Sequence, residues 1–103
     1  MSAVSIRADG ERRYRIDGDL LFGTISGLLS WPESLAMDGG SLVVDLQGVE
    51  HADSAGLALI LEWTDLAVSA GKDLRFANLP KSLIRIAALT NLDSLIPMVE
   101  QGR

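Results

Sequence analysis

Apolar residues recur at every second position in residues 3–8 and again in residues 12–16, with the dipeptide Asp9-Gly10 between the two segments. This alternation is typical of strands with one buried face, and Asp-Gly is a common hairpin turn. The pattern therefore predicts two antiparallel strands. The same hairpin carries four arginines, which form either a solvated face that discourages aggregation or a contact for acidic groups on a partner: Arg7, Arg12, Arg13 and Arg15.

Residues 20–37 carry apolar side chains at helical spacing, but Gly23, Gly27 and Pro32 all weaken a helix there. We expect a short or broken helix that ends at the glycine pair 39–40, because helices commonly end at glycine. Trp31 falls within this segment, and the sequence leaves open whether it is a core residue or an exposed one.

The central part of the chain joins a strand to a long helix. Residues 42–46 form an apolar run without alternation, which is typical of a central strand covered on at least one face. Residues 47–52 are expected to form a short polar loop. The helix then begins at Asp53 or Ser54, since both side chains are good N-cap acceptors, and Gly71 is its expected end.

This central helix has an apolar face nearly twice as wide as the stripe of about 100° that a surface helix needs. Two apolar strips lie side by side on the helical wheel, while Glu62 and Asp65 belong to the polar face. Either the helix is buried between the sheet and another helix, or the strip that contains Trp63 is a docking face for a partner. The first strip is Ile60, Leu61, Thr64, Ala67 and Val68, and the second is Leu59, Trp63, Leu66 and Ala70.

The C-terminal part of the chain continues the same alternation of elements. Residues 73–77 predict a fourth strand, parallel to the central strand because a right-handed crossover through a helix joins the two. Residues 80–89 predict a helix with Pro80 at its first position, residues 92–97 predict a short helix, and the tail from Met98 is expected to be loose. In the helix at 80–89 we expect Leu83, Ile84 and Ala87 to point inward and Lys81 and Arg85 to point outward.

Length and composition limit the possibilities further. A chain of 103 residues is expected to form one domain, residues 1–103, with a single modest core. Its 48% of hydrophobic residues is high for a soluble protein of this size and hints at apolar surface meant for a partner. The net charge of −5 argues against nucleic acid as a ligand, because phosphate binding needs clustered Lys and Arg. The sequence has no cysteines and no signal-peptide pattern, and its longest apolar run is far shorter than the ~20 residues that span a bilayer. We therefore expect a soluble cytoplasmic protein.

Few residues offer chemistry. His51 is the only histidine, and without a cysteine or a second histidine it predicts neither a nucleophilic dyad nor a zinc site. Residues 69–72 lack the glycine and hydroxyl pattern of a phosphate-binding loop. The carboxylates Asp45 and Asp53 lie on opposite sides of a loop with no predicted pocket. We therefore expect no enzymatic activity, no cofactor and no metal, and we expect His51 to be a loop residue near Ser54.

The segment Asp53-Ser54-Ala55-Gly56-Leu57 has a plain structural explanation, a capping side chain followed by small residues that bring the helix close to the strand ends. This segment lies at a characteristic spacing from the strand at residues 42–46 and from Leu92-Asp93-Ser94-Leu95-Ile96-Pro97. In these three segments and their spacing, the chain resembles the STAS domain family, typified by bacterial anti-sigma factor antagonists. Gly18-Asp19-Leu20 adds to the likeness. Within the family the chain is most similar to the MlaB-like branch, the cytoplasmic STAS subunits of Mla-type phospholipid ABC transport systems, through Trp31 and residues 52–61, 65–67 and 87–92.

This resemblance implies an α/β STAS fold, a four-stranded mixed β-sheet with packed α-helices. It also implies a non-enzymatic subunit, peripheral to the inner membrane, that binds the ATPase of a phospholipid-transporting ABC complex. Such a subunit supports assembly and activity of the complex, which maintains outer-membrane lipid asymmetry. The alternative is an anti-sigma factor antagonist regulated by a serine kinase. Ala55 and Asn91 stand where antagonists commonly have a second hydroxyl and a glycine, and both departures favour the transport alternative.

The resemblance also implies a site. Ser54 matches the position on which partner binding depends in the MlaB-like subunits and which a partner kinase phosphorylates in the antagonists. Residues of the surrounding loop are expected to shape the binding surface, and apolar residues of the adjoining helices are candidates for added contact area. The loop residues are His51, Asp53, Ala55 and Gly56, and the apolar candidates are Leu57, Trp63 and Trp31.

Overall fold

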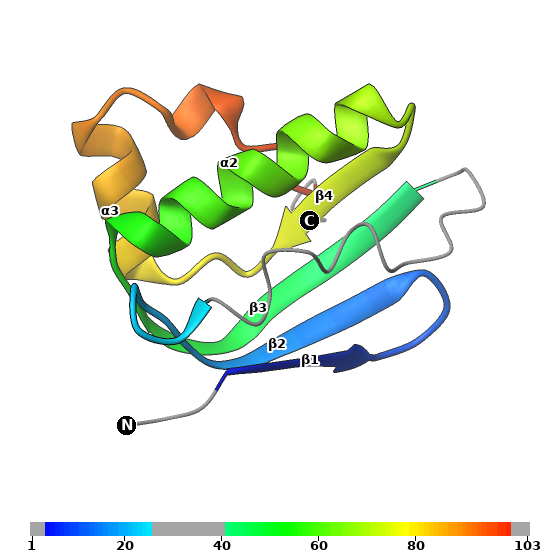
Figure 1. Ribbon diagram of the computed structural model, residues 1–103, viewed down its shortest axis with the longest axis horizontal. Coiled ribbons are helices and arrows are strands. Elements are labelled where there is room, and N and C mark those ends of the chain that lie inside the picture. Colours follow the sequence, from blue (N-terminus) through cyan, green and yellow to red (C-terminus); the bar gives the residue numbers. More distant parts are fainter. Residues whose placement is uncertain (1–3, 26–40, 100–103) are drawn as a thin grey trace.

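The computed structural model describes residues 4–25 and 41–99, and the structural statements below concern those residues. They form a four-stranded sheet in the order β1-β2-β3-β4, with two α-helices and a short 3₁₀ helix (Figure 1). In chain order the elements are β1 (Ser5–Ala8), β2 (Arg13–Leu20), β3 (Ser41–Ala52), α2 (Ser54–Ser69), β4 (Asp73–Ala77), α3 (Lys81–Leu89) and η2 (Asp93–Leu95).

The sheet is mixed. β1 and β2 pair antiparallel, with Ile6 opposite Ile16, which confirms the predicted hairpin. β2 and β3 are parallel, and so are β3 and β4, in which Val44 lies opposite Phe76. The expected α/β fold with a four-stranded mixed sheet is therefore confirmed, and so is the parallel crossover through the central helix.

Two strands are longer than the sequence pattern predicts. β2 continues to Leu20 and β3 continues through residues 47–52, so the expected loop at 47–52 and the expected helix start at residue 20 are wrong. The two extensions pair with each other, Gly18 with Val49 and Leu20 with Ala52, with shifts of register along the ladder. Strand pairing of this kind depends on a distant partner, which a local pattern does not reveal.

Residues 22–24, which the sequence assigned to a helix, form a turn instead, and Ile25 after them has 3₁₀ geometry. The Thr24 hydroxyl donates to the Asp19 carbonyl oxygen at 2.6 Å and accepts from the Leu21 N–H at 3.0 Å. These two hydrogen bonds between the Thr24 hydroxyl and the backbone close the turn directly after β2. The rest of the predicted helix, including Trp31 and the glycine pair 39–40, lies outside the described residues.

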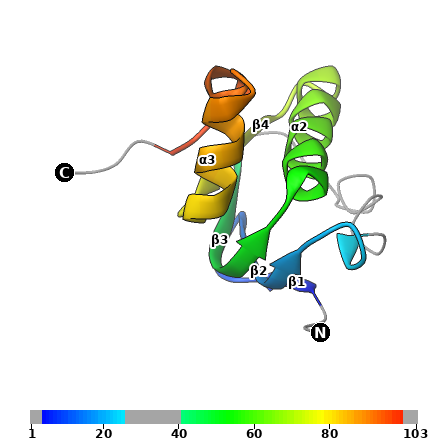
Figure 2. The ribbon, with the colours of Figure 1, turned by 90° about the vertical axis from the view of Figure 1, so that its left-hand side faces the viewer.

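The core lies between one face of the sheet and the helices α2 and α3, which stand side by side in Figure 2. Helix α2 buries Leu59, Ile60 and Trp63 in this core, and Trp63 has no exposed surface. The interpretation of the Trp63 strip as a docking face is therefore wrong. The other interpretation is confirmed, because α2 packs against β3, β4 and α3 and so needs a wide apolar face.

Helix α3 packs through a narrower stripe. Leu83 and Ala87 are buried as expected, while Lys81 and Arg85 are exposed. Ile84, expected inside, is 49% exposed. Its place is taken by the half-buried Ile86, because positions 83, 86 and 87 follow the i, i+3, i+4 spacing of one helix face.

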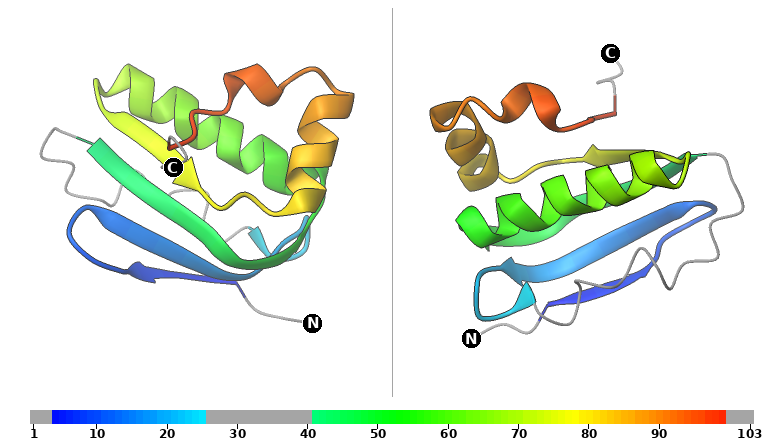
Figure 3. Two further views of the ribbon diagram at one scale, coloured as in Figure 1. Left: turned by 180° about the vertical axis from the view of Figure 1, so that it is seen from behind. Right: turned by 45° about the horizontal axis from the view of Figure 1, so that its top comes forward.

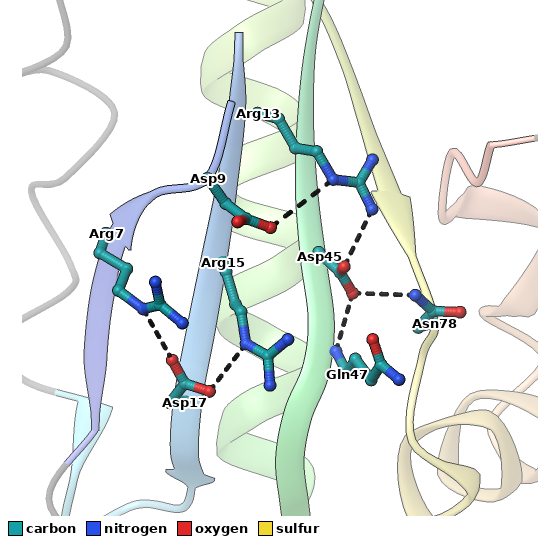
Figure 4. Close-up of polar contacts among 8 residues, drawn as sticks. All are labelled: Arg7, Asp9, Arg13, Arg15, Asp17, Asp45, Gln47 and Asn78. Atoms are coloured by element: carbon teal, nitrogen blue, oxygen red, sulfur yellow. Dashed lines mark hydrogen bonds and ion pairs between the residues drawn. The ribbon is translucent and has the colours of Figure 1, made fainter. Parts of the chain in front are cut away.

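The face of the sheet away from α2 carries ion pairs (Figure 4). The Nε atoms of Arg7 and Arg15 lie 3.3 and 2.9 Å from the two oxygens of Asp17. Arg13 donates to Asp45 at 2.9 Å. Three of the four hairpin arginines thus pair with carboxylates of their own chain, which supports a solvated, internally neutralised face over a contact for acidic groups of a partner.

Asp45 stands out on this face because it is only 4% exposed. One carboxylate oxygen accepts from Arg13, and the other accepts from the Asn78 amide and the Gln47 N–H, each at 2.9 Å. Burial raises the pKa of Asp45, but these three hydrogen bonds outweigh burial and hold the pKa below its usual range. The carboxylate therefore ties β2, β3 and the end of β4 together.

The chain after η2 returns to the edge of β4 (Figure 3). The Phe76 N–H donates to the Pro97 carbonyl oxygen at 2.9 Å, and the Val99 N–H donates to the Phe76 carbonyl oxygen at 3.0 Å. Residues 98 and 99 are therefore paired, contrary to the expectation of a loose tail from Met98, and residues 100–103 lie outside the described part. The predicted short helix within 92–97 is confirmed as η2.

Candidate partner-binding site

The start of α2 is organised by Asp53, one of the two predicted caps. One of its carboxylate oxygens accepts from the Ala55 N–H at 2.9 Å and from the Gly56 N–H at 3.4 Å. The other accepts from the Phe22 N–H at 3.2 Å. Asp53 therefore satisfies free donors of the first helical turn and also fastens the turn after β2 to the helix.

Ser54 is the first residue of α2 and is exposed. No hydrogen bond joins its hydroxyl to another residue in the described ranges 4–25 and 41–99. Because Asp53 performs the capping, the Ser54 side chain is not needed to complete the helix. Ser54 is exposed on a helix start that Asp53 already caps, which is suitable for contact with another molecule.

Gly56 brings the helix start against the end of β2. A Cβ built on Gly56 would lie 2.7 Å from the Leu20 carbonyl oxygen and 3.0 Å from the Leu20 Cβ. The same carbonyl oxygen accepts from the Asp53 N–H at 3.2 Å. Glycine is required by this close approach, and the approach fixes where Ser54 stands relative to the sheet.

His51 lies at the end of β3, so the expectation that it is a loop residue is wrong. Its side chain is 71% exposed, and its Nδ1 atom lies 3.5 Å from a carboxylate oxygen of Asp19, an ion pair only when the imidazole is protonated. The strand places His51 two residues before the cap Asp53. The structure records a contact of the imidazole with Asp19 and none with Ser54 among the described residues.

The structure brings together some of the predicted site residues and separates others. Ala55 and Gly56 share the first turn of α2 with Ser54. Leu57 and Trp63 are 4% and 0% exposed, so their side chains offer no contact area to a partner. This corrects their assignment as possible interface residues: the inward face of α2 requires both positions for the core. Trp31 lies outside the described residues.

Sequence reasoning missed Phe22, which is 83% exposed beside the helix start. The pattern placed this residue in a helix and gave no reason to expect an aromatic ring in solvent. The run Leu20-Leu21-Phe22-Gly23 could have indicated a turn at Phe22, because the glycine ends the apolar run too early for a helix. Phe22 joins the candidate site through its bond to Asp53.

Other kinds of site receive no support from the described residues. Within residues 4–25 and 41–99, no cluster of three or more metal-binding side chains occurs. Helices in the same ranges are all too short or too polar to cross a membrane. The described residues offer a surface with an exposed hydroxyl at Ser54, a capped helix start and the exposed ring of Phe22.

Comparison with known proteins agrees with this geometry. The family model described as "Mlab, STAS domain" matches residues 4–100. A solved structure, a sulfate transporter family protein from Wolinella succinogenes, is similar with a TM-score of 0.68 at 15% sequence identity, over 86% of this chain and 75% of that one. At this identity the likeness concerns the fold. No match is found among curated proteins. The match over nearly the whole chain shows that it belongs to the STAS domain family, in the MlaB-like group, whose domains generally act as protein–protein interaction modules.

Proposed function

We propose that this chain is the STAS subunit of an Mla-type phospholipid-transporting ABC complex, and that it binds the ATPase of that complex through the surface around Ser54. In this role it supports assembly and activity of a system that maintains outer-membrane lipid asymmetry, and it reaches the inner membrane through its partner. The subunit itself performs no catalysis.

The main support for this proposal is that Asp53 caps the helix while Ser54 takes no part in the cap. Asp53 caps α2 with both carboxylate oxygens occupied, while the hydroxyl of Ser54 is exposed and bonded to no other described residue. A side chain with no role in the fold, held on a rigid helix start, is typical of a recognition position. The MlaB-like family match supports the ATPase as the partner.

The exposed hydroxyl also suits the second candidate, an antagonist regulated by a serine kinase. A phosphate on Ser54 would add about −1.5 to −2 charges at pH 7. The N–H groups of Ala55 and Gly56 could otherwise donate hydrogen bonds to an anion, but they already donate to Asp53. The phosphate would thus lie next to a carboxylate, and an apolar partner surface that docks there would have to remove water from it, so phosphorylation is expected to weaken binding of such a partner.

Two substitutions test the proposed function. Ser54→Arg and Ser54→Asp are expected to leave the fold intact, because the side chain points to solvent, and to weaken binding to the purified ATPase subunit at least about thirtyfold by placing an unmatched charge in the interface. Ser69→Arg is the matched control, since Ser69 is exposed at the other end of the same helix.

Circular dichroism establishes that each variant is folded, and calorimetric titration with the ATPase subunit gives the affinities. Folded Ser54 variants that bind as tightly as the wild type would contradict the proposal. Incubation with a cognate serine kinase and ATP, followed by intact mass, addresses the second candidate: stoichiometric phosphate on Ser54 together with absent ATPase binding would favour the antagonist.

A further inference from the structure

An apolar groove runs beside Ser54, between the turn at residues 21–25 and the exposed flank of α2. Its volume is about 560 Å³. Small side chains on the helix make the floor, and the exposed ring of Phe22 makes a wall. Ser54 lies on the same face of α2 as two of the lining residues, Ala58 and Glu62, because the three positions are spaced by four residues. The lining residues are Phe22, Ile25, Ala55, Ala58, Leu59 and Glu62.

The two sides of the groove are held in fixed relation. The Phe22 N–H donates to the Asp53 carboxylate, and the Asp53 N–H donates to the Leu20 carbonyl oxygen, both at 3.2 Å. The Thr24 hydroxyl closes the turn through its bonds to Asp19 and Leu21. The backbone on the two sides of the groove is therefore already in place, which lowers the part of the entropic cost of binding that comes from ordering the backbone.

The charge at the groove indicates what fits it. Glu62 is the one ionisable residue of the lining, it is exposed, and no ion pair links it to any residue in the described ranges. Asp65, less than one helical turn further on, is exposed as well. A hollow of apolar atoms bordered by an unpaired carboxylate complements an apolar side chain that is followed by a cation. The same carboxylates repel the phosphate of an anionic lipid headgroup.

We infer that this groove receives a segment of the ATPase subunit that places a large apolar side chain between Phe22 and Ala58 and a lysine or arginine against Glu62. This inference rests on the proposed function and specifies the chemistry of its partner. Ser54 then lies at one end of the contact and Glu62 at the other, so the partner contacts a single face of the first three turns of α2.

Two substitutions separate the apolar and the ionic parts. Ala58→Trp fills the groove without changing charge, and Glu62→Lys places a cation opposite the expected cation. Each is expected to weaken binding of the ATPase subunit about tenfold or more, and the wild-type affinity is expected to fall as salt is raised. Glu11→Lys is the matched control, since Glu11 is an exposed carboxylate in the turn between β1 and β2 and the change in net charge is the same.

The most direct test exchanges the charges of the two partners, with a cation at position 62 of this chain and an anion on the ATPase subunit. Lysines and arginines of the ATPase subunit are changed singly to Glu, and one of these changes is expected to restore tight binding to the folded Glu62→Lys variant. Wild-type affinity of both folded groove variants, with binding still lost in Ser54→Arg, would overturn this inference and leave the proposed function standing. Absence of binding by the wild type overturns both. Binding of the chain to phosphatidylglycerol vesicles that Ala58→Trp abolishes would overturn the inference in favour of a lipid.

Discussion

Replacement of Gly56 by alanine sets two physical effects against each other. Gly56 is the third residue of α2, and alanine at a helical position is favoured over glycine by about 1 kcal/mol. Helix propensity alone therefore predicts a more stable protein. The structure predicts the opposite, because the new methyl group would lie 2.7 Å from the Leu20 carbonyl oxygen, which belongs to the backbone of a buried strand end and has little room to move.

The magnitude follows from these contacts. Overpacking of a well-packed site costs about 1–3 kcal/mol. Relief of the clash by moving the helix also lengthens the hydrogen bond from the Asp53 N–H to Leu20, which contributes about 1 kcal/mol. After the propensity gain is subtracted, the free energy of unfolding is expected to fall by about 2 kcal/mol. For a domain of this size that corresponds to a drop in melting temperature of about 10 °C.

Urea denaturation and thermal melting of Gly56→Ala measure this effect. Gly23→Ala is the control, since no atom lies within 4 Å of the position of its Cβ, and it is expected to be neutral or slightly stabilising. A Gly56→Ala variant as stable as the wild type, or more stable, would refute the reasoning, because it would mean that the close approach of α2 to β2 does not constrain this position.

Three other changes test the fold around the site. Asp45→Asn is expected to lower the free energy of unfolding by about 2 kcal/mol at pH 7, because its partners lose a charged acceptor. Since the folded-state pKa of Asp45 is depressed, the stability that the carboxylate contributes is present above the unfolded pKa of about 4 and is lost as pH falls through the folded pKa. Urea titrations at several pH values should therefore show the gap between wild type and variant closing below about pH 4. Trp63→Ala is expected to cost about 3–5 kcal/mol in the same assay, whereas a surface Trp would cost little. Asp53→Ala is expected to cost about 1–2 kcal/mol and to speed amide hydrogen exchange at Ala55 and Gly56, and unchanged exchange there would contradict its capping role.

The sequence predicted the elements of this fold better than their limits. Local patterns were sufficient for the hairpin, the central helix and the crossover to β4, because alternation and helical spacing are set by which face is buried. The extension of β3 over residues 47–52 could not be predicted in the same way. Those residues are strand because the end of β2 pairs with them, and the sequence pattern ends β2 at residue 16 and assigns Leu20 to a helix.

Burial of individual side chains shows a similar limit. The wide apolar face of α2 is compatible with a second packing surface or with a docking face, and only the tertiary packing of α2, in which Trp63 is fully buried, decides between the two. Ile84 was placed inside from its spacing to Leu83 and Ala87, yet a small rotation of the helix exposes it and uses Ile86 instead. Spacing defines a face, while the neighbouring element decides which part of the face is covered.

At the candidate site, the sequence located Ser54 but could not separate its role from that of Asp53, because either side chain can cap a helix. The structure makes them different: one carboxylate takes both the helix donors and the Phe22 N–H, and the hydroxyl is left to solvent. A change at Ser54 is therefore expected to cost little stability, so on the proposed function its effect falls on partner binding. A change at Asp53 or Gly56 is expected to alter the helix start first, because Asp53 caps α2 and Gly56 packs against Leu20.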